Sequence, residues 1–285
     1  MKQLLILSGK GGTGKTTVAS SFIKLAEAKA FADCDVEAPN LHLINHEGVK
    51  ESKPYFGMKK AVINQDKCIS CGICQSNCRF DAIDFDGNYT VDKYACEGCA
   101  VCQLVCPSKA IEMVEANDGE TTIYRGNRLF STAELKMGSG NSGKLVTQVK
   151  KNLRDNLTNE ELVIIDGSPG IGCPVIASLS GVDMVLIVAE PTLSGISDME
   201  RILKTASIFK TKTAVCVNKY DTNIELTRKI ETYTLSQNIA FLGVIPYDKK
   251  VVEIINQGRA VVEEDFSVSK AIKDVYSKAI ELINI

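Results

Sequence analysis

The chain has 285 residues, of which 45% are hydrophobic and 24% charged, so it can bury a substantial core and is not a disordered polymer. Lys and Arg number 33 against 35 Asp and Glu, mixed along the chain, which gives no basis for a nucleic-acid partner. The longest apolar run, residues 184–189, is far shorter than the ~20 residues that a membrane span needs. The apolar stretch at residues 4–7 is too short for a secretory signal. We therefore expect a cytoplasmic protein with no membrane span.

The first predicted unit is a strand, a glycine-rich turn and a helix. Residues 4–7 are an apolar run that leads into the turn, and residues from 16 to about 29 have a helical pattern. Further apolar runs alternate with helical stretches at residues 162–165, 184–189, 214–217 and 241–245. Strands that are apolar throughout are typical of a parallel sheet covered on both faces. The sequence predicts an α/β fold, a mostly parallel sheet flanked by helices.

Cysteines mark a segment with a different composition. Eight of the 11 cysteines lie between Cys68 and Cys106, and without an export signal they are poor candidates for disulfides. Residues 66–86 resemble residues 94–114 at an offset of 28 positions, which indicates an internal repeat. We therefore predict a small α+β domain, residues 58–118, inserted into a larger domain formed by residues 1–57 and 119–285.

The glycine-rich turn carries the first chemical motif. Residues 9–17, GKGGTGKTT, match G-x-x-x-x-G-K-[ST], in which backbone N–H groups surround phosphate oxygens. Lys15 would reach the outer phosphates, and the Thr16 hydroxyl would bind Mg²⁺. The nucleotide-binding residues expected here are Gly11, Gly12, Thr13, Gly14, Lys15, Thr16 and Thr17.

The glycine-rich turn has two other possible interpretations. The same glycines satisfy the dinucleotide pattern G-x-G-x-x-G, with Asp33 and Asp35 about 20 positions further on. A lysine and a hydroxyl at the start of the helix have a function on a triphosphate with Mg²⁺, and the dinucleotide motif does not require them. A glycine-rich turn without a ligand is the other alternative, and the flanking strand and helix count against it. ATP is therefore the expected ligand.

Asp166 directly follows the apolar run at residues 162–165. A carboxylate at the end of a buried strand can hold a Mg²⁺-bound water, so we expect Mg²⁺ to be bound through Thr16 and Asp166. An aspartate that only caps a helix or forms a turn is the alternative.

The cysteine repeat is typical of a bacterial ferredoxin. Each copy has the spacing C-x2-C-x2-C-x3-C, and the fourth cysteine of such a run binds the other cluster. Zinc is the alternative, although zinc sites usually combine two C-x2-C pairs across a longer loop. Arg79 follows Cys78 where the ferredoxin pattern has proline. We predict one [4Fe-4S] cluster on Cys68, Cys71, Cys74 and Cys106, and a second on Cys78, Cys96, Cys99 and Cys102.

Two of the three remaining cysteines lie near the nucleotide motifs. Cys34 stands between Asp33 and Asp35, and Cys173 follows the Asp166 turn. Small packing residues are the favoured interpretation of both. A transient metal ligand is the alternative for Cys173.

These motifs together resemble one group of ATPases. Lys10 with Lys15 in KGGTGKTT, residues 33–35 (DCD) followed by residues 39–41 (PNL), and residues 166–170 (DGSPG) are similar to the deviant phosphate-loop ATPases of the MinD, ParA, Mrp and nitrogenase iron-protein group. The branch it most resembles is the MinD-superfamily ATPases with an inserted ferredoxin domain.

The resemblance implies roles for further residues. Lys10 would cross an ATP-sandwiched homodimer to the partner subunit's phosphates, and Asp35 would position or activate the attacking water. Lys10, Lys15 and Asp35 are therefore the expected catalytic residues. Asn218 would hydrogen-bond adenine, and the loop that contains Pro246 would close over the base.

The expected function combines both motifs. We expect an ATPase that couples a nucleotide-driven dimer switch to two [4Fe-4S] clusters, for electron transfer or for metallocofactor maturation of an unidentified partner protein. An ATP-timed carrier of a metal cluster and a positioning ATPase that docks through its ferredoxin domain are the alternatives.

Overall fold

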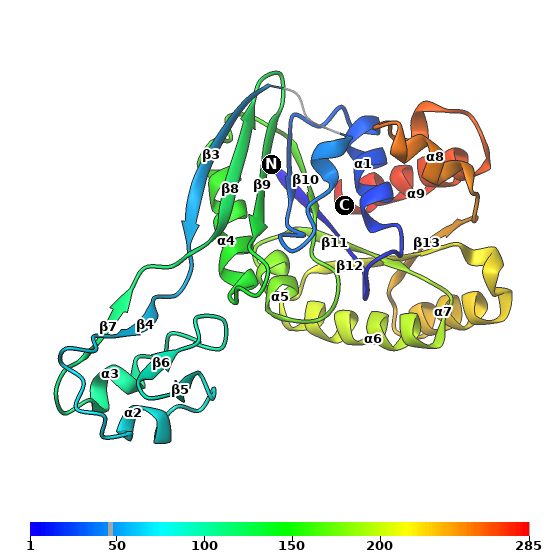
Figure 1. Cartoon of the computed structure of the whole chain (residues 1–285). Helices are drawn as coiled ribbons and strands as arrows, with labels where there is room; N and C mark the ends of the chain where they lie inside the picture. The colour runs from blue at the N-terminus through cyan, green and yellow to red at the C-terminus, as the bar shows by residue number, and fades with distance from the viewer. Residues whose placement is uncertain (45–47, 285) are drawn as a thin grey trace. The chain divides into compact units, whose positions relative to one another are not determined.

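The chain forms two compact units in a computed structural model that describes residues 1–44 and 48–284 (Figure 1). The larger unit comprises Met1–Ser52, Thr121–Glu134 and Gly143–Ile285, and the smaller unit comprises Lys53–Glu120 and Leu135–Ser142. The smaller unit contains the cysteine-rich residues 58–118. It also takes in a few residues on each side and a second short segment, which the composition of the chain did not indicate.

A nine-stranded sheet forms the framework of the larger unit, in the order β13-β12-β11-β1-β10-β2-β9-β8-β3. The pairs from β13 to β9 are all parallel. Every residue of β11 is buried, as expected of a strand with helices on both faces. The strands are β1 (Lys2–Leu7), β2 (Ala30–Asp33), β3 (Val49–Phe56), β8 (Asn117–Arg125), β9 (Leu129–Leu135), β10 (Leu162–Asp166), β11 (Met184–Ala189), β12 (Lys212–Asn218) and β13 (Ala240–Ile245).

Helices cover both faces of this sheet. Leu4 and Ile6 of β1 pack with the buried faces of α1 and α9, and since side chains alternate along a strand, Leu5 and Leu7 face the other layer. Figure 1 shows α4 to α7 on the side of the sheet opposite α1, α8 and α9. The helices are α1 (Lys15–Leu25), α4 (Ser142–Arg154), α5 (Cys173–Leu179), α6 (Leu193–Ile208), α7 (Ile224–Ser236), α8 (Lys250–Asn256) and α9 (Ser267–Asn284), with short 3-10 turns η1 (Leu41–Leu43), η2 (Tyr220–Thr222) and η3 (Val261–Glu263).

The topology brings three polar segments to one edge of the sheet. β1, β10 and β2 are neighbours, and their register pairs Ile6 with Asp166 and Asp166 with Asp33. The loop of residues 8–14 therefore leaves β1 beside the ends of β10 and β2. Ligands of open α/β sheets bind at this carboxyl edge.

The smaller unit has a two-fold repeat in its backbone. Left-handed backbone conformations occur at Ser70, Gly72 and Asp81, and again 28 positions later at Gly98, Ala100 and Lys109. The strands β4 and β7 pair antiparallel, as do β5 and β6. The elements are β4 (Lys60–Ile63), α2 (Ile73–Ser76), β5 (Ile83–Phe85), β6 (Tyr89–Val91), α3 (Val101–Val105) and β7 (Ile111–Val114).

Some elements differ from the sequence-based expectation. α1 ends at Leu25, and not near residue 29, because the chain turns at Glu27 with a φ of 46°. The three strands β3, β8 and β9 were not predicted, since polar residues interrupt their apolar pattern. In the part of the chain that the structure describes, no helix is long and apolar enough to cross a membrane.

The packing of β10 yields a stability prediction. Ile165 is fully buried, so Ile165→Ala should lower the free energy of unfolding by about 2–5 kcal/mol through lost burial and a cavity. Ile208→Ala is the matched control, because Ile208 is 78% exposed and should cost less than about 0.5 kcal/mol. Urea unfolding followed by circular dichroism measures both, and equal losses would contradict the assigned core.

Candidate functional site

The loop between β1 and α1 has a backbone that depends on glycine. Gly12 and Gly14 have φ values of 79° and 92°, which side chains rarely adopt. A Cβ at Gly14 would also lie 2.2 Å from the amide nitrogen of Asn218. Gly14 is thus fixed both by its backbone conformation and by its neighbour. The loop turns its backbone toward the first residues of α1, where N–H groups can meet an anion.

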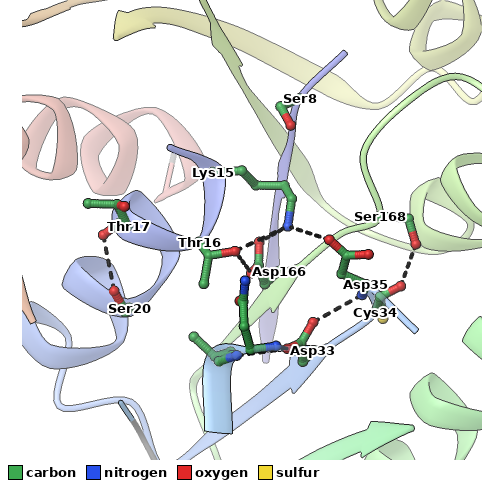
Figure 2. Close-up of polar contacts among 12 residues, drawn as sticks. Ser8, Lys15, Thr16, Thr17, Ser20, Asp33, Cys34, Asp35, Asp166 and Ser168 are labelled. Carbon is green, nitrogen blue, oxygen red and sulfur yellow. Dashed lines mark hydrogen bonds and ion pairs between the residues drawn. The ribbon is translucent and has the colours of Figure 1, made fainter. Parts of the chain in front are cut away.

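Asp166 binds the first two residues of α1 (Figure 2). Its Oδ1 lies 2.7 Å from Lys15 Nζ, and its Oδ2 accepts a hydrogen bond of 2.7 Å from the Thr16 hydroxyl. Asp166 is fully buried, and Lys15 is 5% exposed. The structure therefore brings together Lys15, Thr16 and Asp166, which the sequence placed about 150 positions apart.

Asp33 and Asp35 shape the neighbouring loop. Asp33 Oδ1 accepts a 3.0 Å hydrogen bond from the backbone N–H of Asp35, and its Oδ2 accepts two more, each 3.0 Å, from Asn40 and Leu41. Asp35 Oδ2 lies 3.8 Å from Lys15 Nζ. Asp33 therefore holds the loop that presents Asp35, a positioning role that sequence reasoning missed.

Negative charge exceeds positive charge around Lys15. Burial opposes the ammonium form of Lys15, but Asp166, Asp33 and Asp35 outweigh burial and raise its pKa. Burial and the repulsion of Asp166 raise the pKa of Asp33 to about 7, against the effects of Lys15 and the backbone N–H groups. Burial also raises the pKa of Asp35. Three carboxylates around one ammonium suit a site that receives a divalent cation.

Lys10 is paired within its own chain. Lys10 Nζ lies 3.1 Å from Glu190 Oε2, and Lys219 Nζ lies 3.0 Å from Glu190 Oε1. Lys219 also donates a 2.9 Å hydrogen bond to the carbonyl of Gly12. Although partial burial opposes its charge, the hydrogen bonds from Lys219 and Lys10 lower the pKa of Glu190. Sequence analysis missed Glu190, but its position directly after the buried strand β11 is the same signal that identified Asp166.

A cavity of about 430 Å³ opens over the loop. Residues from Ser8 to Thr17 line one part of it together with Asp35, and Leu43, Ile44 and Ile255 give another part an apolar wall. The cavity thus offers a polar region for phosphates and an apolar region of the kind that suits a base.

The two residues expected at adenine, Asn218 and Pro246, are not among the described residues that line this cavity. The Asn218 amide donates a 2.7 Å hydrogen bond to the carbonyl of Thr13, so in this state it supports the loop. Pro246 directly follows β13.

The eight clustered cysteines line two small cavities of the smaller unit. Cys68, Cys71, Cys74 and Cys106 line one cavity. The other is lined by Cys78, Cys96, Cys99 and Cys102. Each cavity therefore combines three cysteines of one repeat with the fourth cysteine of the other repeat. Over residues 1–44 and 48–284, no three or more Cys, His, Asp or Glu side chains lie close enough to hold a single metal ion.

Two of these thiols accept hydrogen bonds from the backbone. The N–H groups of Ala82 and Ala110 lie 3.4 and 3.3 Å from the Sγ atoms of Cys78 and Cys106. Cys106 Sγ also lies 3.6 Å from the Ser108 hydroxyl, and although burial opposes the thiolate, these contacts lower the pKa of Cys106. These contacts favour the thiolate form of Cys106, which is the form that binds metals.

Burial and mutual repulsion act in the opposite direction on two other cysteines. Burial raises the pKa of Cys74, and the nearby Cys68 and Cys71 add to the effect. Burial also raises the pKa of Cys102, and the nearby Cys96 and Cys99 add to the effect. Thiolates gathered this closely repel one another unless positive charge lies between them.

The remaining cysteines are divided between core and surface. Cys34 and Cys216 are fully buried, and burial raises the pKa of each to about 12, so both are inert packing residues. Cys173 is exposed at the start of α5.

The larger unit has the geometry of a phosphate-loop nucleotide-binding protein. A glycine loop joins a buried strand to a helix that opens with Lys15 and Thr16, and Asp166 ends the neighbouring strand. The family model described as the CobQ/CobB/MinD/ParA nucleotide binding domain matches residues 4–261. The chain belongs to this family.

Known proteins resemble the whole chain or a part of it. An uncharacterised protein of Methanocaldococcus jannaschii is 34% identical over 288 residues, covering 99% of this chain and 97% of the relative. A ferredoxin of Pyrobaculum islandicum is 34% identical over 70 residues, which cover 24% of this chain and 65% of the ferredoxin. The MinD protein of Pyrococcus horikoshii, solved with Mg-ADP, shares the fold with a TM-score of 0.58 at 16% identity, over 99% of this chain and 96% of that chain.

The paired lysines lead to a pH-dependent prediction. Glu190→Gln should lower the free energy of unfolding at pH 7 by about 1.5–3 kcal/mol, because the variant loses the negative charge that both lysines share and keeps one acceptor oxygen for the two of them. The folded-state pKa of Glu190 is lowered, so its contribution is present above its unfolded pKa and lost as the pH falls through the folded value. The difference in free energy of unfolding between wild type and Glu190→Gln should therefore become smaller as the pH falls from 7 to about 3.

Urea unfolding at several pH values measures this difference. Glu231→Gln is the control, since Glu231 is exposed on α7 and should show little effect at any pH. A difference that stays constant with pH would contradict the ion-pair assignment.

Proposed function

We propose that the chain is an ATPase that binds two [4Fe-4S] clusters and couples a nucleotide-driven dimer switch to them. The switch would serve electron transfer to a partner protein, or maturation of the partner's metallocofactor. One observation carries the proposal: a single chain holds a phosphate-loop site and two cavities that are each lined by four cysteines.

The phosphate-loop site supports binding of ATP with Mg²⁺. Backbone N–H groups of Gly11, Gly12, Thr13 and Gly14 would surround the phosphates, with Lys15 on the outer phosphates and Thr17 at the first turn of α1. Thr16 and Asp166 would hold Mg²⁺, because their oxygens already lie together and the surrounding carboxylates exceed the available positive charge. Mg²⁺ would supply charge neutralisation of the phosphates.

Asp35 is the proposed residue for the attacking water. Its carboxylate lines the cavity beside Lys15, and burial raises its pKa, which makes it a better proton acceptor than an ordinary aspartate. Asp33 fixes the loop that carries it. We propose that the loop first closes over ATP and that Asp35 then positions a water molecule. The γ-phosphoryl group is transferred to this water while Lys15 neutralises the charge on the phosphates.

Lys10 is the proposed link to a second subunit. It lies at the exposed side of the loop, 39% exposed, and its present partner Glu190 also binds Lys219. When Lys10 is released, Glu190 keeps its ion pair with Lys219. The release therefore costs less free energy than leaving Glu190 without any cation would cost. Lys10 could then reach the phosphates of the partner subunit in an ATP-dependent homodimer. Asn218 and Pro246 would contact adenine only after the loop has rearranged.

The cysteine cavities fit [4Fe-4S] clusters by their donor chemistry. Each offers four thiols in a crossed arrangement, which is the ligand pattern of two-cluster ferredoxins. A zinc ion would need all four sulfurs at about 2.3 Å from one metal atom. In a cluster, each cysteine sulfur binds a different iron, so the four sulfurs stay further from one another. The ferredoxin match supports the same assignment. Bound clusters would supply one-electron transfer.

Connectivity supports coupling between the two sites. The chain enters the smaller unit at Lys53, after the Asp33–Asp35 segment, and it later returns to the larger unit, where β9 pairs with β2. We infer that a conformational change at Asp35 is transmitted along the chain to the segment that carries the cysteines.

A positioning ATPase is the second candidate, because a MinD protein shares the fold. MinD-like membrane attachment through the last helix is not favoured, since Val268, Ile272 and Val275 of α9 are buried in the core.

The nucleotide site gives one prediction. Lys15→Gln should weaken MgATP binding about 10- to 150-fold, because charge-assisted hydrogen bonds to phosphate are each worth about 1.5–3 kcal/mol. Thr16→Ala keeps the lysine and should abolish the Mg²⁺ dependence of binding. Calorimetric titration with ATP, with and without Mg²⁺, measures both effects. Lys204→Gln, on the exposed face of α6, is the control, and wild-type affinity in both site variants would overturn the nucleotide assignment.

The cysteine cavities give another prediction. Anaerobically prepared protein should contain about eight iron and eight sulfide per chain. Cys71→Ala and Cys99→Ala should each reduce the iron content toward about half, because each removes a ligand from one site only. Cys173→Ala is the matched control, since Cys173 is exposed like Cys71 and Cys99 but lies outside both cavities. Protein with zinc and no sulfide would contradict the cluster assignment.

A further inference from the structure

Lys60 is buried in the smaller unit. It opens β4, and the residue is only 6% exposed. Its ammonium donates a hydrogen bond of 2.5 Å to the backbone carbonyl of Cys96. The other lysines of this unit are exposed in the described structure: Lys53, Lys59, Lys67, Lys93, Lys109 and Lys136.

The charge of Lys60 has no anionic partner among the described side chains. No carboxylate in residues 1–44 or 48–284 forms an ion pair with it, and its contact is the neutral carbonyl of Cys96. A buried ammonium without an anion is costly, and a carbonyl dipole does not cancel its charge. A negative group is therefore expected close to Lys60.

The cavity next to Lys60 is lined by four thiols. Cys96 contributes both the carbonyl that Lys60 binds and a side chain that lines this cavity, and Ala61 lines it directly after Lys60. The two segments pack tightly, since a Cβ at Gly98 would lie 2.3 Å from the carbonyl oxygen of Lys59. Lys60 is not itself among the described residues that line the cavity formed by Cys78, Cys96, Cys99 and Cys102, but its ammonium is bound to the backbone of Cys96, whose side chain lines it.

We propose that Lys60 is the buried counter-charge of the [4Fe-4S] cluster on these four cysteines, and that it raises the reduction potential of that cluster selectively. The inference rests on the proposed function. Four thiolates outweigh the positive charge of the iron–sulfur core, so the cluster is an anion and gains a further negative charge when it accepts one electron. A nearby ammonium stabilises the more negative reduced form, which raises the potential.

The second cavity has no corresponding lysine among the described residues. Cys68, Cys71, Cys74 and Cys106 line it, and in the described part of the unit Lys67 and Lys109 are exposed and screened by solvent. Both cavities have the same N–H contact to the sulfur of their crossing cysteine, from Ala82 and from Ala110. The backbone of the repeat is thus matched. Glu97 also lines the first cavity, but it is exposed and screened by solvent, so the buried Lys60 is the charge that makes the two sites electrostatically different.

The test separates the charge of Lys60 from its hydrogen bond. Lys60→Gln keeps a donor for the Cys96 carbonyl and removes the charge, whereas Lys60→Arg keeps both. Lys59→Gln is the control, because Lys59 is adjacent and exposed. Each protein is reconstituted anaerobically, assayed for iron and sulfide, and titrated with dithionite. Paramagnetic NMR of the cysteine β-protons follows each cluster separately, and EPR records the reduced spins.

In Lys60→Gln, the ratio of oxidised to reduced cluster at the Cys96 site should rise about tenfold at a fixed ambient potential. That change equals a fall of about 59 mV in a one-electron midpoint potential. The other cluster should not change, and Lys60→Arg and Lys59→Gln should resemble wild type.

Each alternative outcome has a defined meaning. Full iron loading with an unchanged Cys96-site potential in Lys60→Gln would overturn the inference and leave the proposed function intact. An equal shift at both clusters would also overturn it, because the effect would not be local. A wild-type chain that binds no iron and sulfide would overturn the proposed function and the inference with it.

Discussion

The hydrogen bonds of Asp166 to Lys15 and Thr16 are the contact on which the nucleotide site depends. They join the carboxyl end of β10 to the first turn of α1 across about 150 positions of sequence, with lengths of 2.7 Å each. The parallel register of β1, β10 and β2 makes this contact possible, because it places three strand ends at one edge. The phosphate loop and the Asp33–Asp35 loop are both arranged around it.

Both units use one buried lysine beside several acidic groups. Lys15 lies among Asp33, Asp35 and Asp166, and Lys60 is bound to the backbone of Cys96, one of four cysteines that line a cavity. Around Lys15 the carboxylates outnumber the neighbouring cation, and near Lys60 four thiols can become thiolates. Such sites are suited to ligands that bring positive charge, which on this account are Mg²⁺ and the iron of a cluster.

Motifs that are continuous in sequence were predictable from it. The loop of residues 9–17 and the strand-end Asp166 follow from local spacing, and the crossed grouping of the cysteines follows from the ferredoxin pattern. In the described structure Thr16 contacts Asp166, and each group of four cysteines lines one cavity. Glu190 was missed although it follows a buried strand as Asp166 does, whereas Lys60 was not predictable, because its role depends on a partner that is distant in sequence. The strands β3, β8 and β9 were missed because their apolar pattern is broken, and only pairing within the sheet defines them.

The central claim is that the nucleotide site and the cysteine sites act on one another. The most direct test is an anaerobic redox titration of the iron-loaded protein, followed by EPR, with and without MgATP. Lys15→Gln serves as the control in which nucleotide binding is impaired. The account predicts that MgATP shifts the midpoint potential or the spectrum of at least one cluster in wild type and not in Lys15→Gln. Titrations of wild type that are unchanged by saturating MgATP would contradict it.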